Sequence, residues 1–195
     1  MGNLDAARDR LARSVKGFRA QAIRWATGQT LTGLAWVALA TGDARQAERL
    51  LDEATSVLRD AGPWFLSLVA YLRAILAVRR GDADEAIAVI RDSLTSIREL
   101  KDQFALVGAL AVLAAAAALK GDDAWVARIL GAQDAVTDGT GVIVVDSSSR
   151  HLREQVERDS QARLGPQRWA LAYAAGRKAS IDALIKDIDN RQPQG

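Results

Sequence analysis

The sequence predicts an all-α protein in which pairs of helices stack in series as a solenoid. Three observations support this fold class: a composition dominated by helix formers, a repeat of about 40 residues, and a glycine corner at the same place in each repeat. The chain has 195 residues, of which 49% are hydrophobic and 26% charged, with only 3 prolines and 5% aromatics. Such a composition favours helices over strands and suffices for one globular unit.

The repeat begins at four glycines, which lie 40, 39 and 40 residues apart. The aligned strings are GNLDAARDRL from Gly2, GDARQAERLL from Gly42, GDADEAIAVI from Gly81 and GDDAWVARIL from Gly121. Apolar residues follow each glycine at helical spacing, so each corner opens an amphipathic helix. Glycine can take the left-handed conformation that ends a helix, and the next Asp or Asn can cap the following one.

Small residues also recur before three of the glycines, at four and seven positions upstream. They are Ala35 and Ala38, Ala74 and Ala77, and Ala114 and Ala117. Small side chains at these offsets allow two helices of a hairpin to approach closely. Because a hairpin cannot bury its apolar face alone, we expect successive hairpins to stack.

The predicted elements follow from these corners, in chain order. We expect helices near 3–20, 26–41, 44–60, 63–80, 83–100, 102–119 and 123–137. Gly62 and Pro63 mark one junction, because glycine closes a helix and proline starts one. The first repeat has no partner helix before it, so we expect a domain taken from a longer protein.

The repeat pattern ends near residue 137. Residues 1–137 are predicted to form the hairpin array, 138–147 an extended connector with one short strand possible, 148–189 a three-helix C-terminal cap, and 190–195 a disordered tail. The cap helices are expected near 148–164, 166–176 and 180–189, with Asp146 or Ser147 as the first capping residue.

Helical hairpins with small residues before a turn glycine resemble tetratricopeptide repeats, which form right-handed solenoids. The period here is nearer 40 than 34 residues. It is similar to the longer tetratricopeptide-like repeats of large bacterial signal-transduction ATPases.

The C-terminal part is similar to the closing segment of LuxR-type and adenylate-cyclase-linked regulators. The matching positions are Leu130-Gly131-Ala132, Thr140-Gly141, Leu164-Gly165, Trp169, Tyr173, Gly176-Arg177, Ser180 and residues 183–185. The chain departs from that family in having VIVVDSSS at the connector and no helix-turn-helix after residue 189. The resemblance implies a signal-reading module beside an ATPase or kinase domain, and it leaves the output domain open.

Signatures of catalysis are missing from the sequence. No phosphate-binding loop, dinucleotide-binding glycine motif, zinc-binding His-Glu-x-x-His or nucleophile elbow occurs. His151, the only histidine, is interpreted as a surface or capping residue, and the acidic groups at 82–85 and 122–123 as helix caps rather than a metal site. We therefore predict no enzyme activity, no catalytic residue, no metal and no cofactor.

A binding groove is predicted on the first helix of each hairpin. In the tetratricopeptide pattern, residues ten, six and three before the turn glycine face the concave surface. Transferred by this offset, the groove comprises Thr32, Trp36, Leu39, Tyr71, Ile75 and Val78, with Ala111, Ala115 and Ala118 beyond, and Gln29 and Arg79 flank it. The mostly apolar floor would suit an amphipathic helix or apolar peptide, or a small ligand; burial of these residues by neighbouring hairpins is the alternative.

Charge and cysteine content indicate the compartment and the classes of partner that we expect. The chain has no cysteine and no apolar signal segment, so we expect a cytoplasmic protein, and the apolar run 104–119 is read as a buried helix rather than a membrane span. Net charge is +2, with mildly basic ends. Basic ends could contact nucleic acid, but arginines on solvated helix faces give the same pattern, so we do not expect nucleic acid as a partner of this domain.

The leading functional hypothesis is a non-catalytic interaction and sensing module of a bacterial regulator. It would bind a protein segment, including another domain of its own chain. The alternatives are a sensor that binds a small effector and the regulatory extension of a serine/threonine kinase.

Overall fold

The computed structural model describes residues 3–142 and 147–191, which form ten helices and no strand. The all-α prediction is therefore confirmed. The helices are α1 (Leu4–Ala20), α2 (Arg24–Ala40), α3 (Ala44–Leu58), α4 (Pro63–Arg80), α5 (Ala83–Glu99), α6 (Gln103–Leu119), α7 (Asp123–Thr140), α8 (Ser147–Leu164), α9 (Pro166–Arg177) and α10 (Ile181–Arg191). The short strand and the Asp146 cap considered for the connector, the side chains of Ser147 and His151, and tail residues 192–195 lie outside what is described.

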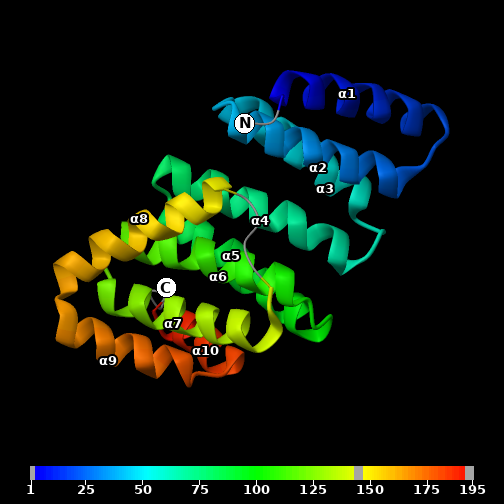
Figure 1. Ribbon diagram of the computed structural model, residues 1–195. Coiled ribbons are helices and arrows are strands. Elements are labelled where there is room, and N and C mark those ends of the chain that lie inside the picture. Colours follow the sequence, from blue (N-terminus) through cyan, green and yellow to red (C-terminus); the bar gives the residue numbers. More distant parts are fainter. Residues whose placement is uncertain (1–2, 143–146, 192–195) are drawn as a thin grey trace. The chain divides into compact units, whose positions relative to one another are not determined.

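The chain divides into two compact units, Met1–Leu76 and Ala77–Gly195, and the division falls within α4. In unit 1, α2 packs against both α1 and α3, as Figure 1 shows for the blue and cyan helices. Neighbours in sequence are thus neighbours in space, as expected for serial helical hairpins.

The core of unit 1 lies between α2, α3 and the first part of α4. It is built from aliphatic side chains, and among them Leu51 and Leu58 of α3 are completely buried. Ala35 and Ala38 of α2, two of the small residues before the Gly42 corner, lie in this core. Close packing here therefore depends on the small residues that the repeat pattern indicated.

The glycine corners have a common geometry. Gly42, Gly81 and Gly121 have φ of +82°, +78° and +72°. At each corner the amide of the following Asp donates to a carbonyl five residues earlier, at 2.9 to 3.1 Å. That Asp then caps the next helix by accepting a hydrogen bond from the amide three residues later. The predicted role of the Gly-Asp pairs is confirmed.

Two further corners use the same geometry without glycine. Ala22 and Lys101 have φ of +54° and +53°, and the amides of Ile23 and Asp102 donate to carbonyls five residues back. A left-handed conformation costs a residue with a side chain about 1 to 2 kcal/mol. The predicted helices leave a break at each of these two corners, but the left-handed conformation itself was not predicted, because alanine and lysine do not favour it.

Unit 2 contains three helices in series and three that pack on them. α6 packs against α5 and α7, and α7 also contacts α8 and α9, while α10 packs on α5. Figure 1 shows α7 between the green α6 and the orange α9. Most side chains of α6 are buried, which confirms the prediction for its apolar run. Among the described residues, no helix combines the length and apolar content that crossing a membrane requires.

Two helices extend beyond their predicted ends. α7 continues to Thr140 and stops at Gly141, whose φ is +71°, so residues 138–140 are helical rather than part of the connector. An ion pair of 2.8 Å from Arg177 to Asp138 holds this last turn. α10 continues to Arg191, two residues into the predicted tail, because Arg191 pairs with Asp122.

Candidate functional site

The structure places the eight residues predicted for the groove and its flanks in different environments. Trp36 is exposed, and Gln29, Tyr71 and Ile75 are half-buried in unit 1. Val78 and Arg79 belong to unit 2, where Val78 is half-buried and Arg79 exposed.

Two of the predicted residues are covered instead of open to a groove. Thr32 is buried and its hydroxyl donates to the carbonyl of Gly28 at 2.9 Å. Leu39 is buried in the core of unit 1. Farther along, Ala111 and Ala115 are also buried. The tetratricopeptide offsets therefore select both exposed and buried residues, because apolar side chains on these helices also fill the interior.

Trp36 and Tyr71 lie together, with ring centroids 6.4 Å apart at an angle of 56°. Trp36 is on α2 and Tyr71 on α4, so the contact joins the first helices of two successive hairpins. Rings at this separation and tilt attract each other beyond their area burial. This pair is the part of the predicted groove that the tertiary structure brings together.

A second aromatic group lies at the start of the same two helices. Phe65 has its ring centroid 6.3 Å from that of Trp25 and 5.1 Å from that of Trp64, which meets it edge-on. Neither Trp25 nor Trp64 belongs to the predicted groove. Both indoles are open to solvent.

We define the aromatic face as Trp25, Trp36, Trp64, Phe65 and Tyr71, all of unit 1. Its three tryptophans expose 57%, 36% and 52% of their surface. Large aromatics are usually mostly buried, so three exposed indoles on one pair of helices are unusual. The signal in the sequence was the spacing of Trp25 and Trp36, which places both on one side of α2.

The charged residues beside the aromatic face are arginines, and two of them form ion pairs with aspartates of α3 or of the turn after it. α2 and α4 contain no acidic residue. Arg73 pairs with Asp52 at 2.6 Å and Arg24 with Asp60 at 3.5 Å. The first pair ties α4 to α3, and the second ties α2 to the turn after α3.

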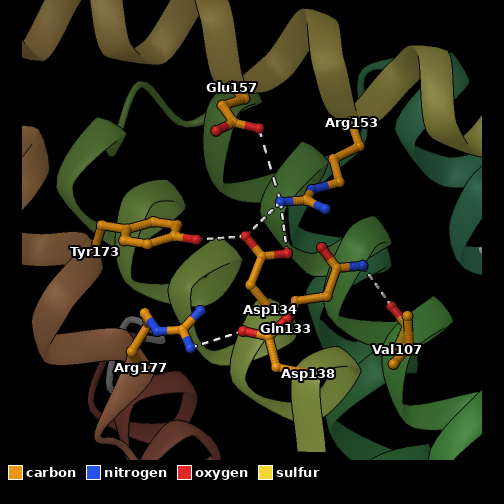
Figure 2. Close-up of polar contacts among 8 residues, drawn as sticks. All are labelled: Val107, Gln133, Asp134, Asp138, Arg153, Glu157, Tyr173 and Arg177. Atoms are coloured by element: carbon orange, nitrogen blue, oxygen red, sulfur yellow. Dashed lines mark hydrogen bonds and ion pairs between the residues drawn. The ribbon is translucent and has the colours of Figure 1, made fainter. Parts of the chain in front are cut away.

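A polar cluster in unit 2 holds α8 and α9 to α7 (Figure 2). Asp134 lies between Arg153 of α8, at 2.8 Å, and the hydroxyl of Tyr173 of α9, which donates to it. Glu157 contacts Arg153 at 3.7 Å. Burial, and then the hydrogen bond to Asp134, raise the pKa of Tyr173 above its ordinary value. The ion pairs of this cluster connect three helices and thereby hold α8 and α9 to α7.

The residues that carry the C-terminal resemblance have structural roles in this region. Trp169 is buried, Gly131 and Gly176 are buried in the contact of α7 with α9, and Arg177 pairs with Asp138. The motif therefore describes how α9 docks on α7. It does not mark a site open to a ligand.

The acidic residues of the segments 82–85 and 122–123 cap helices or form ion pairs. Asp82 and Asp122 cap helices, and Asp84 pairs with Lys120 at 2.6 Å. Asp123 pairs with Arg163 at 2.7 Å, and this bond, opposed by burial, lowers the pKa of Asp123. Across residues 3–142 and 147–191, no three acidic or histidine side chains gather where they could hold a metal ion.

Comparison of the chain with family models, curated proteins and solved structures finds no match.

Proposed function

We propose that this chain is a non-catalytic interaction module that binds an apolar protein segment on the aromatic face. The observation that carries the proposal is the exposure of three tryptophans around Phe65 and Tyr71. Exposed indoles lose unfavourable contact with water when a partner covers them, and Trp and Tyr dominate the energetics of protein interfaces.

The spacing of the aromatic face suits a helix of the partner. Trp25 and Trp36 are eleven residues apart on α2, which corresponds to about 16 Å along the helix axis. An amphipathic helix of about three turns, laid along α2, would reach both indoles with residues of one face. Such a helix could come from another protein or from another domain of the same chain.

The proposal also includes the kind of protein to which this module belongs. The repeats and the motif at α7 and α9 resemble the helical modules of bacterial regulators, in which binding of a segment would report a signal to another domain. Direct sensing of a small effector is a separate proposal, supported by a cavity in unit 2 that charged and apolar side chains line.

The test uses a phage-displayed library of peptides about 16 residues long, selected on the chain. We expect selected peptides to carry apolar residues at helical spacing and to bind at least about 30-fold more weakly to the Trp36→Ala, Trp64→Ala double variant, since truncating an interface aromatic costs about 2 kcal/mol or more. Titration calorimetry with the synthetic peptides measures the change.

The matched control is Phe104→Ala, which removes an aromatic that is 59% exposed in unit 2. It should leave peptide affinity unchanged, and far-ultraviolet circular dichroism should be the same for all variants. Equal affinity of the double variant and the unmodified chain would remove the aromatic face as the binding site.

A further inference from the structure

The cavity of unit 2 that supports effector sensing has a volume of about 200 Å³, and its lining indicates which class of molecule it would bind. It lies between α5, the corner before α7, the first turn of α7 and the end of α10. An apolar cavity of about 150 Å³ in a protein is large enough to bind benzene. The space therefore fits a molecule of roughly ten non-hydrogen atoms.

Two ion pairs line this cavity. Lys120 pairs with Asp84 at 2.6 Å, and Arg191 pairs with Asp122. All four side chains are partly open to solvent, with the Asp84 carboxylate the most exposed at 77%. Exposed ion pairs contribute little to stability, so a charged ligand can replace one partner of each pair at a small cost in free energy.

The remaining wall is apolar except for one donor. Ile87, Ile188 and Trp125 line the cavity and are buried. The guanidinium of Arg191 lies 4.9 Å from the ring centroid of Trp125. Trp125 is 2% exposed, and its Nε1 has no hydrogen-bond partner among the described residues.

A buried indole N–H without an acceptor is uncommon, because it leaves a desolvated donor unsatisfied. Tryptophan nitrogen is a donor only, so a group that satisfied it would be an acceptor, such as a carboxylate or carbonyl oxygen. Arg191 and Lys120 line the same cavity and would attract a carboxylate.

We propose that this cavity binds a small zwitterion, an α-amino acid with an aliphatic side chain. The cavity contains two cations and two anions, so its charge is balanced. A ligand with only a carboxylate would draw Lys120 and Arg191 away and leave Asp84 and Asp122 without their cationic partners. A ligand with only an amine would do the reverse. An amino acid supplies both charges, and its side chain would occupy the space beside Ile87 and Ile188.

The test follows the indole N–H signals of the nitrogen-labelled chain by NMR, with the Trp125 signal identified by its loss in Trp125→Phe. L-leucine should shift that signal to saturation below about 10 mM and leave the indole signals of Trp25, Trp36 and Trp64 in place. The matched probes are 4-methylpentanoate, which lacks the amine, and 3-methylbutylamine, which lacks the carboxylate. Each should bind at least about tenfold more weakly than leucine.

Arg191→Gln should weaken leucine binding by about tenfold or more, because it removes a charged partner of the carboxylate. Lys186→Gln, which changes an exposed lysine of the same helix outside the cavity, should not. An unmoved Trp125 signal, equal binding of the three probes, or unchanged affinity in Arg191→Gln would each overturn the proposal. Because the cavity is in unit 2, Trp36→Ala should leave leucine binding intact, so this test is independent of peptide binding.

Discussion

Gly131 of α7 and Gly176 of α9 lie against the backbone of each other's helix with no room for a methyl group. A Cβ on Gly176 would come within 1.9 Å of the carbonyl oxygen of Arg128, and one on Gly131 within 2.2 Å of that of Tyr173. The atoms in the way belong to the backbone and cannot move aside as a side chain could. These two glycines therefore set how closely α9 approaches α7.

Gly176→Ala should destabilise unit 2 by about 3 kcal/mol, because α9 must shift away and uncover Trp169. Urea denaturation followed by circular dichroism measures the loss. The matched control is Gly139→Ala in α7, where a Cβ would meet nothing within 4 Å. That change should raise stability by about 0.5 kcal/mol, since alanine is the better helix former. Equal effects of the two changes would contradict the close helix contact.

The corner at Lys101 predicts a stabilising substitution. Lys101 has φ of +53°, so Lys101→Gly should raise the free energy of unfolding by about 0.5 to 1 kcal/mol. Gly81→Ala, which puts a side chain at a corner of the same geometry, should lower it by about 1 kcal/mol. Chemical denaturation of both variants tests the pair, and a loss of stability in Lys101→Gly would show that the lysine has another role.

The Tyr173 hydroxyl stabilises the cluster around Asp134, and this effect depends on pH. Tyr173→Phe should cost about 1.5 kcal/mol at neutral pH, because Asp134 loses one of its donors. The pKa of Tyr173 is raised in the folded state, so its contribution is complete below the ordinary value of 10.0 and is lost as the pH rises through the folded-state pKa. The difference in unfolding free energy between the two proteins should therefore shrink above pH 10. A difference in unfolding free energy that stays constant up to pH 12 would argue against the hydrogen bond from the Tyr173 hydroxyl to Asp134.

The ion pair of Arg163 and Asp123 makes the stability of the fold depend on pH under acidic conditions. Its hydrogen bond lowers the pKa of Asp123 below the ordinary value of 3.8, so the pair stabilises the fold above that pH and the effect is lost as the pH falls through the folded-state pKa. Arg163→Gln should raise the pKa of Asp123, as carboxyl NMR titration can show. Arg158→Gln, on the same helix, should leave the pKa of Asp123 unchanged.

Much of the fold could be predicted from the sequence because its cues are local. A glycine with a following Asp ends one helix and caps the next through bonds spanning five residues or fewer, so the corners at Gly42, Gly81 and Gly121 follow from the chain alone. The sequence also predicts a break between helices at Lys101, but not the left-handed conformation there, because lysine itself does not favour that conformation.

The candidate site depended more on tertiary packing. The sequence determined that α2 carries two tryptophans on one side and that its alanines lie on another. Only the folded structure decided that Thr32 and Leu39 are covered while Trp25 and Trp64 gather around Phe65, since side chains from helices distant in sequence compete for the same interior space. The cavity beside Trp125 likewise exists only because α10, about sixty residues later in the chain, brings Arg191 to Asp122. Helical periodicity specifies which side chains share a face, but not which face another helix will cover.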